Sequence, residues 1–170
     1  VDGLVGSEMC IRDRDSAGGN LAASLCIQRN KENKPLPNAQ LLIYPATDLR
    51  LVTNSMTKDC SEGFVLTEEL MKWFVDHYLD SAELKNDPRV SPLLAEKFEG
   101  LPPALIITAG FDPLRDEGLE YYRMIMKANV KARAVTLNGT VHAAEGIFVK
   151  YVPELFESVI NDIKGFAYSL

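Results

Sequence analysis

The sequence has no apolar run that approaches the roughly 20 residues that a membrane-spanning helix needs. It contains three cysteines, Cys10, Cys26 and Cys60, and their spacing matches neither a metal site nor a dithiol redox motif. No segment resembles a secretory signal peptide. We therefore expect no membrane span and no bound metal, and the pattern favours reduced thiols in a cytoplasmic protein.

Basic residues are in the minority. The 170 residues include 24 acidic and 18 basic side chains, which gives a formal net charge of -6, and the basic residues are scattered. Surfaces that bind nucleic acid or anionic membranes are usually basic, so we expect neither partner. The hydrophobic fraction of 46% is ordinary for a soluble protein, and the length suffices for one domain with a core.

The first 14 residues show no clean periodicity of a helix or a strand. Residues 8–14 read Glu-Met-Cys-Ile-Arg-Asp-Arg and resemble the translation of a transposon-end adapter used to prepare sequencing libraries. Residues 4–7 match the translation of the bases that precede this stretch in one version of the adapter. We therefore predict that residues 1–14 are an adapter-derived artefact, excluded from fold reasoning as a tag would be. The alternative is a genuine N-terminus of unusual sequence.

The rest of the chain alternates between helical and strand patterns, and a strand is expected just before the first helix. Residues 48–63 and 87–94 are expected to be irregular, and Asn138–Gly139 is a turn signal. Helices are predicted at 16–30, 67–79, 116–129 and 153–168, and strands at 40–44, 104–109 and 132–137. This order predicts an α/β fold with a parallel sheet and helices on both of its faces.

Three chemically suited side chains follow strands of this sheet. Ser16 opens the first helix, Asp112 follows the strand that ends at Ala109, and His142 follows the strand that ends near Leu137. Functional groups collect beyond the carboxyl ends of parallel strands. A serine hydroxyl needs a base to become a nucleophile, histidine has suitable basicity, and a carboxylate orients the histidine. We predict that Ser16, Asp112 and His142 are catalytic, in the chain order typical of α/β-hydrolases.

The flanking sequences resemble a known family. Residues 15–23 read Asp-Ser-Ala-Gly-Gly-Asn-Leu-Ala-Ala and resemble the nucleophile motif of hormone-sensitive-lipase-like esterases, also called bacterial family IV. Residues 109–118 are similar to the acid motif of that family, whose first aspartate maps to Asp112. His142 lies where the family has its His-Gly-Phe motif. The resemblance covers residues 15–170. It independently supports the prediction that Ser16 and Asp112 are catalytic.

The resemblance implies a function and an organisation. Residues 15–170 would be the C-terminal part of an α/β-hydrolase domain whose early strands are missing. The protein would be a serine carboxylic ester hydrolase that acts on small apolar esters through an acyl-enzyme, with no cofactor. A lid segment is expected at about 49–87, and some of its aromatic and apolar side chains would either line an acyl pocket or belong to the core: Phe64, Leu66, Trp73, Phe74 and Tyr78.

Three departures from the family pattern affect these expectations. Arg14 stands where the motif has its first glycine, and Ala143 and Ala144 replace the Gly-Phe that usually follows the histidine. The upstream His-Gly-Gly-Gly-type segment, which supplies oxyanion donors in the family, is absent. Only the backbone N–H of Ala17 can be assigned to the oxyanion hole. We therefore expect the 170-residue chain itself to be inactive or nearly so.

Less specific interpretations stand beside these predictions. Ser16 could simply be a helix N-cap, and Asp112 could serve only to form a turn. Asp116 and Glu117 are rival acids, although their positions at a helix start suit capping better. His77 lies within a predicted helix and fits a packed or partly exposed residue. The parent could also be an amidase or deacetylase on the same fold, or a non-catalytic small-molecule-binding protein. Its oligomeric state is open.

Overall fold

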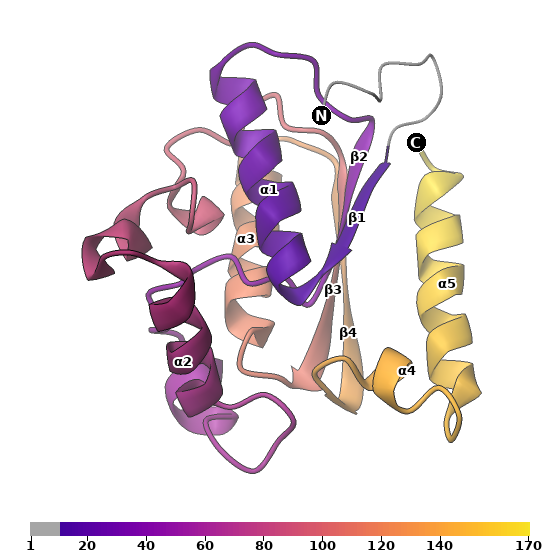
Figure 1. The fold of residues 1–170 in the computed structure, drawn as a ribbon. Helices are drawn as coiled ribbons and strands as arrows, with labels where there is room; N and C mark the ends of the chain where they lie inside the picture. Colours follow the sequence, from indigo (N-terminus) through magenta and orange to yellow (C-terminus); the bar gives the residue numbers. More distant parts are fainter. Residues whose placement is uncertain (1–10) are drawn as a thin grey trace.

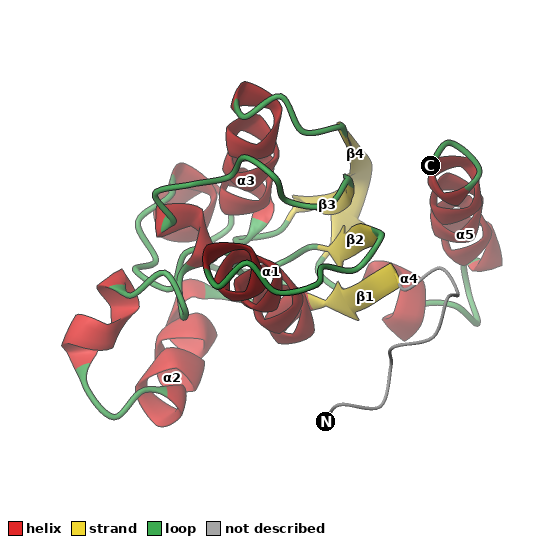
Figure 2. Ribbon diagram, turned by 90° about the horizontal axis from the view of Figure 1, so that it is seen from above, coloured by secondary structure: helices red, strands yellow, loops and turns green. Residues whose placement is uncertain are grey.

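A parallel sheet forms the centre of the chain, as the alternating pattern predicted. The computed structural model describes residues 11–170, with side chains from residue 15 onward. Four strands lie in the order β1-β2-β3-β4, all parallel (Figures 1 and 2). The strands are β1 (Ile11–Asp15), β2 (Ala39–Ile43), β3 (Ala104–Phe111) and β4 (Ala132–Val141).

Helices cover both faces of the sheet. Figure 2 shows α1 and α3 on one side of the strands and α5 on the other. The α-helices are α1 (Ser16–Lys31), α2 (Glu68–Tyr78), α3 (Arg115–Lys127), α4 (Ala144–Ile147) and α5 (Pro153–Ala167), with a π-helix at Ser55–Asp59 and 3₁₀ turns at Ala82–Asn86 and Pro92–Leu94. The helices predicted at 16–30, 67–79, 116–129 and 153–168 are thus confirmed to within two residues at each end.

Two apolar layers hold the helices against the sheet. Successive side chains of a strand point to opposite faces, so Leu42 packs in the layer under α1 and α3, whereas Leu41 packs in the layer under α5. Val159 and Phe166 of α5 are both buried there. A strand that is buried on both faces reads as a continuous apolar run, which is why β2 and β3 could be located from sequence.

The strand β1 was not expected from its residues. The sequence of 1–14 shows no strand periodicity, yet Ile11–Asp15 pair with Ala39–Ile43 along β2. Parallel pairing uses backbone N–H and C=O groups, which almost any sequence supplies. The strand occupies the position required directly before Ser16. Residues 1–10 of the segment predicted to be adapter-derived lie outside the described part of the chain, and the origin of that segment stays a prediction.

The strand β4 is longer than predicted because it contains a bulge. The turn expected at Asn138–Gly139 is wrong: pairing with β3 continues to Phe111↔Val141 after a register shift. Gly139 takes up this shift with a φ of 76°, a left-handed conformation that glycine adopts without steric cost. His142 therefore lies in the short turn directly between β4 and α4.

The segment predicted as a lid, 49–87, packs beside the sheet as a small apolar unit. Figure 1 shows α2 on the same side of the sheet as α1 and α3. The side chain of Thr67 accepts a hydrogen bond from the N–H of Leu70 at 3.2 Å, so Thr67 is the N-cap of α2. The buried cluster consists of Ala46, Leu49, Leu51, Met56, Leu66, Met71, Val75 and Leu114. Among residues 11–170, no helix is long and apolar enough to cross a membrane.

Candidate active site

Ser16 lies at a sharp turn between β1 and α1. Its φ is 50°, a left-handed conformation that costs a residue with a side chain about 1–2 kcal/mol. Such strain persists where the surrounding structure enforces it, often at functional sites. Small neighbours at 17–19 permit the turn. The N-cap position falls to Asp15, so the alternative role of Ser16 as the cap of this helix is wrong.

The three predicted catalytic side chains meet at the carboxyl end of the sheet. His142 Nε2 lies 3.0 Å from the hydroxyl oxygen of Ser16, and His142 Nδ1 lies 2.7 Å from Asp112 Oδ2. The second oxygen of Asp112 accepts a hydrogen bond from the N–H of Leu114 at 2.9 Å. Asp112 is fully buried. With a proton on Nδ1, the imidazole presents Nε2 as an acceptor to the Ser16 hydroxyl.

The rival residues do not reach this site. His77 is exposed on α2, and its Nδ1 lies 2.8 Å from the Trp73 carbonyl oxygen. Asp116 and Glu117 lie in the first turn of α3, as predicted. The Asp116 carboxylate accepts hydrogen bonds from Ser55 and Arg115, and the Glu117 carboxyl accepts them from the backbone of residues 47 and 48. His142 pairs with Asp112 instead.

Tyr44 packs against the imidazole and binds Glu145, and neither residue was predicted from the sequence. The ring centroids of Tyr44 and His142 lie 4.6 Å apart at 59°. The Tyr44 hydroxyl donates a hydrogen bond to Glu145, and both residues are buried. Burial and the Glu145 carboxylate raise the pKa of Tyr44, so the phenol keeps its proton. Tyr44 directly follows β2, whereas the predicted strand at 40–44 included it. Its place at the carboxyl end of that strand was the signal that could have identified it.

The family's glycine after the histidine is replaced by Ala143, which has a φ of 58°. We predict that Ala143→Gly raises the free energy of unfolding by about 0.5–1 kcal/mol, because relief of left-handed strain exceeds the added entropy of the unfolded chain. Urea or thermal unfolding measures the change. Ala144→Gly is the matched control: Ala144 lies in α4, so its replacement should destabilise. An unchanged or lower stability of Ala143→Gly would contradict the prediction.

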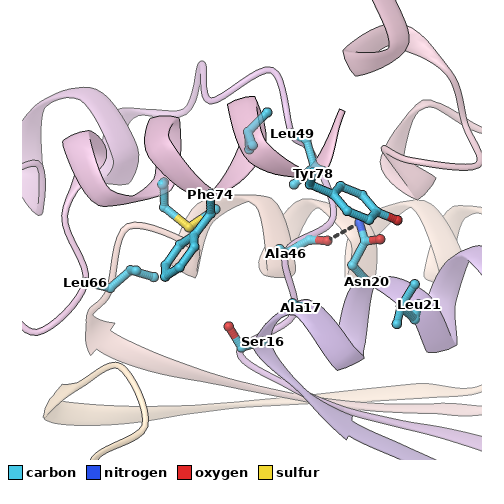
Figure 3. A pocket seen from close by; sticks show the side chains of 11 residues that line it. Ser16, Ala17, Asn20, Leu21, Ala46, Leu49, Leu66, Phe74 and Tyr78 are labelled. Carbon is cyan, nitrogen blue, oxygen red and sulfur yellow. Dashed lines mark hydrogen bonds between the residues drawn. The ribbon is translucent and has the colours of Figure 1, made fainter. Parts of the chain in front are cut away.

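An apolar cavity of about 360 Å³ opens beside Ser16 (Figure 3). Figure 3 shows Leu66 and Phe74 across the space from Ser16. The lining comprises Ser16, Ala17, Asn20, Leu21, Ala46, Leu49, Leu66, Met71, Phe74, Val75 and Tyr78. The amide of Asn20 donates hydrogen bonds to the carbonyl oxygens of Ala46 and Val90, both at 2.7 Å. Asn20 thereby joins α1 to the opposite wall.

The aromatic and apolar side chains predicted for the pocket divide into two groups. Leu66, Phe74 and Tyr78 line the cavity. Phe64 instead stacks on Phe111, with ring centroids 5.3 Å apart. Trp73 is 54% exposed and packs against the rings of its helix neighbours. Within α2 the helical period explains the difference, because Trp73 precedes Phe74 by one residue and therefore points away from the cavity.

The burial of Glu117 leads to a pH-dependent prediction. Burial, together with the carboxylates of Asp48 and Asp112, raises the pKa of Glu117 well above its ordinary value of 4.5. As pH rises above that value, the unfolded state loses its proton before the folded state does, so this residue lowers stability progressively. Glu117→Gln does not titrate. We predict that the stability of this variant relative to wild type increases between pH 5 and pH 8, by at most about 1.4 kcal/mol per pH unit.

Urea unfolding at the two pH values measures this difference. Asp80→Asn, at an exposed position, is the control. Its free energy of unfolding should differ from that of wild type by the same amount at both pH values. Parallel changes of wild type and Glu117→Gln with pH would contradict the prediction.

Comparisons with known proteins agree with this geometry. Residues 15–145 match the family of the α/β-hydrolase fold. A carboxylic ester hydrolase, LipN of Mycobacterium tuberculosis, is 44% identical over 79% of this chain and 37% of its own length. An ethyl acetate hydrolase of Pseudomonas putida is 34% identical over 75% of this chain and 40% of its own length.

Solved structures give the same result. The hyperthermophilic esterase of Pyrobaculum calidifontis superposes with a TM-score of 0.79 at 39% identity, covering 85% of this chain and 48% of that one. The chain thus spans less than half the length of these relatives. Fold, motifs and relatives agree, and the chain belongs to the α/β-hydrolase family, in its hormone-sensitive-lipase-like branch.

Proposed function

We propose that the complete protein, meaning residues 15–170 together with the upstream part of the gene product, is a serine carboxylic ester hydrolase for small apolar esters. One observation carries the proposal. Ser16, His142 and Asp112 are joined by hydrogen-bond distances of 3.0 and 2.7 Å beside an apolar cavity. Relatives named as a carboxylic ester hydrolase and an ethyl acetate hydrolase support the same class.

The proposed reaction begins with attack by Ser16 on the ester carbonyl carbon. His142 Nε2 accepts the hydroxyl proton as the new C–O bond forms, and Asp112 stabilises the resulting imidazolium. The carbonyl oxygen becomes an oxyanion near the start of α1. The N–H of Ala17 has no partner within its own helix, because the first N–H groups of a helix lack intrahelical acceptors, and we assign it as one oxyanion donor.

Collapse of this intermediate expels the alcohol, which takes the proton from His142, and leaves an acyl group on Ser16. A water molecule then gives a proton to His142 and attacks the acyl carbon, and the acid is released with Ser16 restored. The histidine returns to its starting state, so each turnover consumes one water and one ester. No cofactor takes part in this proposal.

The cavity favours small substrates. Its volume of about 360 Å³ lies at the lower end of the roughly 300–1,000 Å³ of ligand pockets. Its walls are mostly aliphatic or aromatic, so burial of an apolar substituent supplies the binding free energy. An acyl or alcohol group of a few carbons fits this space beside Ser16.

Matched substrates test the proposed class. The complete protein should hydrolyse p-nitrophenyl butyrate much faster than the anilide of the same acid. Comparable rates on both, or a faster anilide, would favour the alternative of an amidase or deacetylase. No hydrolysis of either, together with tight binding of small apolar molecules, would favour a non-catalytic binding protein.

We also predict that the 170-residue chain is at least about 10²–10³-fold less active than the complete protein. The loss of a single oxyanion donor typically costs this much, and in the described part of the chain only Ala17 is assigned as a donor. The measurement compares p-nitrophenyl butyrate hydrolysis by the two proteins at equal concentration of folded protein, with circular dichroism as the control for folding. Equal turnover by the short chain would contradict the prediction.

A further inference from the structure

Three consecutive residues at the start of α3, Arg115, Asp116 and Glu117, each bond to the segment that forms the far wall of the cavity. They lie three to five residues after Asp112 in the sequence. The proposed ester chemistry assigns none of them a task. Their contacts nevertheless join the acid that orients His142 to residues 46–59.

Glu117 makes the most buried of these contacts. Its side chain is fully buried, and Oε1 accepts hydrogen bonds from the backbone N–H groups of Thr47 at 2.7 Å and Asp48 at 3.1 Å. The Thr47 hydroxyl donates in return to the Glu117 carbonyl oxygen at 2.9 Å. Oε2 has no hydrogen-bond partner among the described residues. Oε1 therefore accepts both hydrogen bonds that the side chain makes, and the oxygen of a neutral amide could take its place.

Asp116 attaches a second part of the same segment, at Ser55, to the start of α3. Its Oδ2 accepts the N–H of Ser55 at 2.9 Å, and the Ser55 hydroxyl donates to the carbonyl of Pro113 at 2.7 Å. Arg115 donates to Asp116 Oδ1 and to Asp59 Oδ2, both at 2.9 Å. Ser55 is fully buried. The π-helix that contains Ser55 and Asp59 is thereby attached to the start of α3.

The hydrogen bonds of Glu117 and Asp116 hold residues that are adjacent to the cavity wall. Ala46 and Leu49 line the cavity and flank the Glu117 contacts at 47 and 48. Met56, next to Ser55, packs in the cluster with Leu66 and other wall residues. The opposite wall contains Ser16 and Asn20 on α1. The width of the cavity therefore depends on where α3 holds residues 46–59.

We propose that Glu117 and Asp116 are positioning residues that place residues 46–59 relative to Ser16 and so determine how large an acyl group the cavity accepts. The effect on substrates rests on the proposed ester hydrolase function, whereas the effect on the loop does not. Neither residue touches the reacting atoms. Their loss should alter KM for longer esters more than kcat for short ones.

Hydrogen–deuterium exchange and kinetics on the complete protein test the proposal together. In Glu117→Leu, the amides of Thr47 and Asp48 lose their acceptor and should exchange about tenfold faster, as expected for one lost buried hydrogen bond. KM for p-nitrophenyl hexanoate should rise severalfold, with kcat for the acetate almost unchanged. Glu117→Gln keeps an acceptor oxygen in place and should increase neither the exchange of these amides nor KM at pH 7.

Two further variants keep the test decisive. Thr47→Val removes only the hydrogen bond from the Thr47 hydroxyl to the backbone carbonyl oxygen of Glu117. It leaves the Glu117 carboxyl in place and should give a smaller increase in exchange at Thr47 and Asp48 than Glu117→Leu. Asp116→Leu should increase exchange at Ser55. Unchanged exchange at Thr47 and Asp48 in Glu117→Leu or, if that variant does not fold, unchanged exchange at Ser55 in Asp116→Leu, would overturn the proposal. An increase in exchange or KM in Glu117→Gln as large as that in Glu117→Leu would also overturn it. If wild type hydrolyses no ester, the proposed function fails while the exchange data still decide the anchoring role.

Discussion

Ser16→Ala should lower kcat/KM for p-nitrophenyl butyrate by roughly 10⁶-fold in the complete protein, a loss typical for the nucleophile of a serine hydrolase. The alanine removes the only hydroxyl within 3.0 Å of His142 Nε2 that the described residues provide. The residual rate would come from binding and from the oxyanion donors alone. Steady-state kinetics and labelling by a fluorophosphonate probe measure the effect, and the variant should not be labelled.

A serine on the same helix provides the control for this experiment. Ser24 is buried in α1, and its hydroxyl has no hydrogen-bond partner in the described part of the chain. Ser24→Ala should keep full labelling and activity, because it removes a hydroxyl that bonds nothing. Labelling of Ser16→Ala at the wild-type rate would show that another residue is the nucleophile and would overturn the assignment.

Asp112→Asn should lower kcat by about 10⁴-fold while the fold is preserved. An amide NH₂ facing His142 Nδ1 would favour the imidazole tautomer that carries its proton on Nε2, and this tautomer cannot accept the proton of Ser16. The amide oxygen can still accept the N–H of Leu114 in place of Oδ1, so the loop keeps its internal bond.

Kinetics across pH together with urea unfolding separate catalysis from stability in this variant. Asp80→Asn, which changes an exposed carboxylate, should retain the wild-type kcat. A loss of less than tenfold in Asp112→Asn would mean that the histidine is oriented by another group, and Glu145, two residues beyond Ala143, would then be examined first.

The sequence was sufficient to predict the parallel sheet and the meeting of the three side chains. Apolar strands that are buried on both faces leave an uninterrupted signal, and the carboxyl ends of parallel strands necessarily share one edge. Asp112 and His142 follow predicted strands and Ser16 opens the first helix, where a strand was expected just before it, so their convergence required no knowledge of loop geometry. The structure brings together all three.

Other features of the site depend on geometry that carries no local signal. The bulge in β4 adds residues to one strand without changing its composition, and Asn138–Gly139 therefore predicted a turn. Glu117 stands where acidic residues usually complement a helix N-terminus, although its carboxyl bonds to a loop about 70 positions away in the sequence. Tyr44 and Glu145 lie 101 positions apart, and no periodicity relates them.

The separation of the site residues along the chain has a consequence for refolding. The contact between Ser16 and His142 spans 126 positions, and β1 and β4, which carry them, lie at opposite ends of the strand order. Contacts of such long range form late, after shorter loops have closed. Recovery of enzymatic turnover after dilution from denaturant would therefore lag behind the return of the helical circular dichroism signal. Its rate would measure how fast the contact between Ser16 and His142 forms.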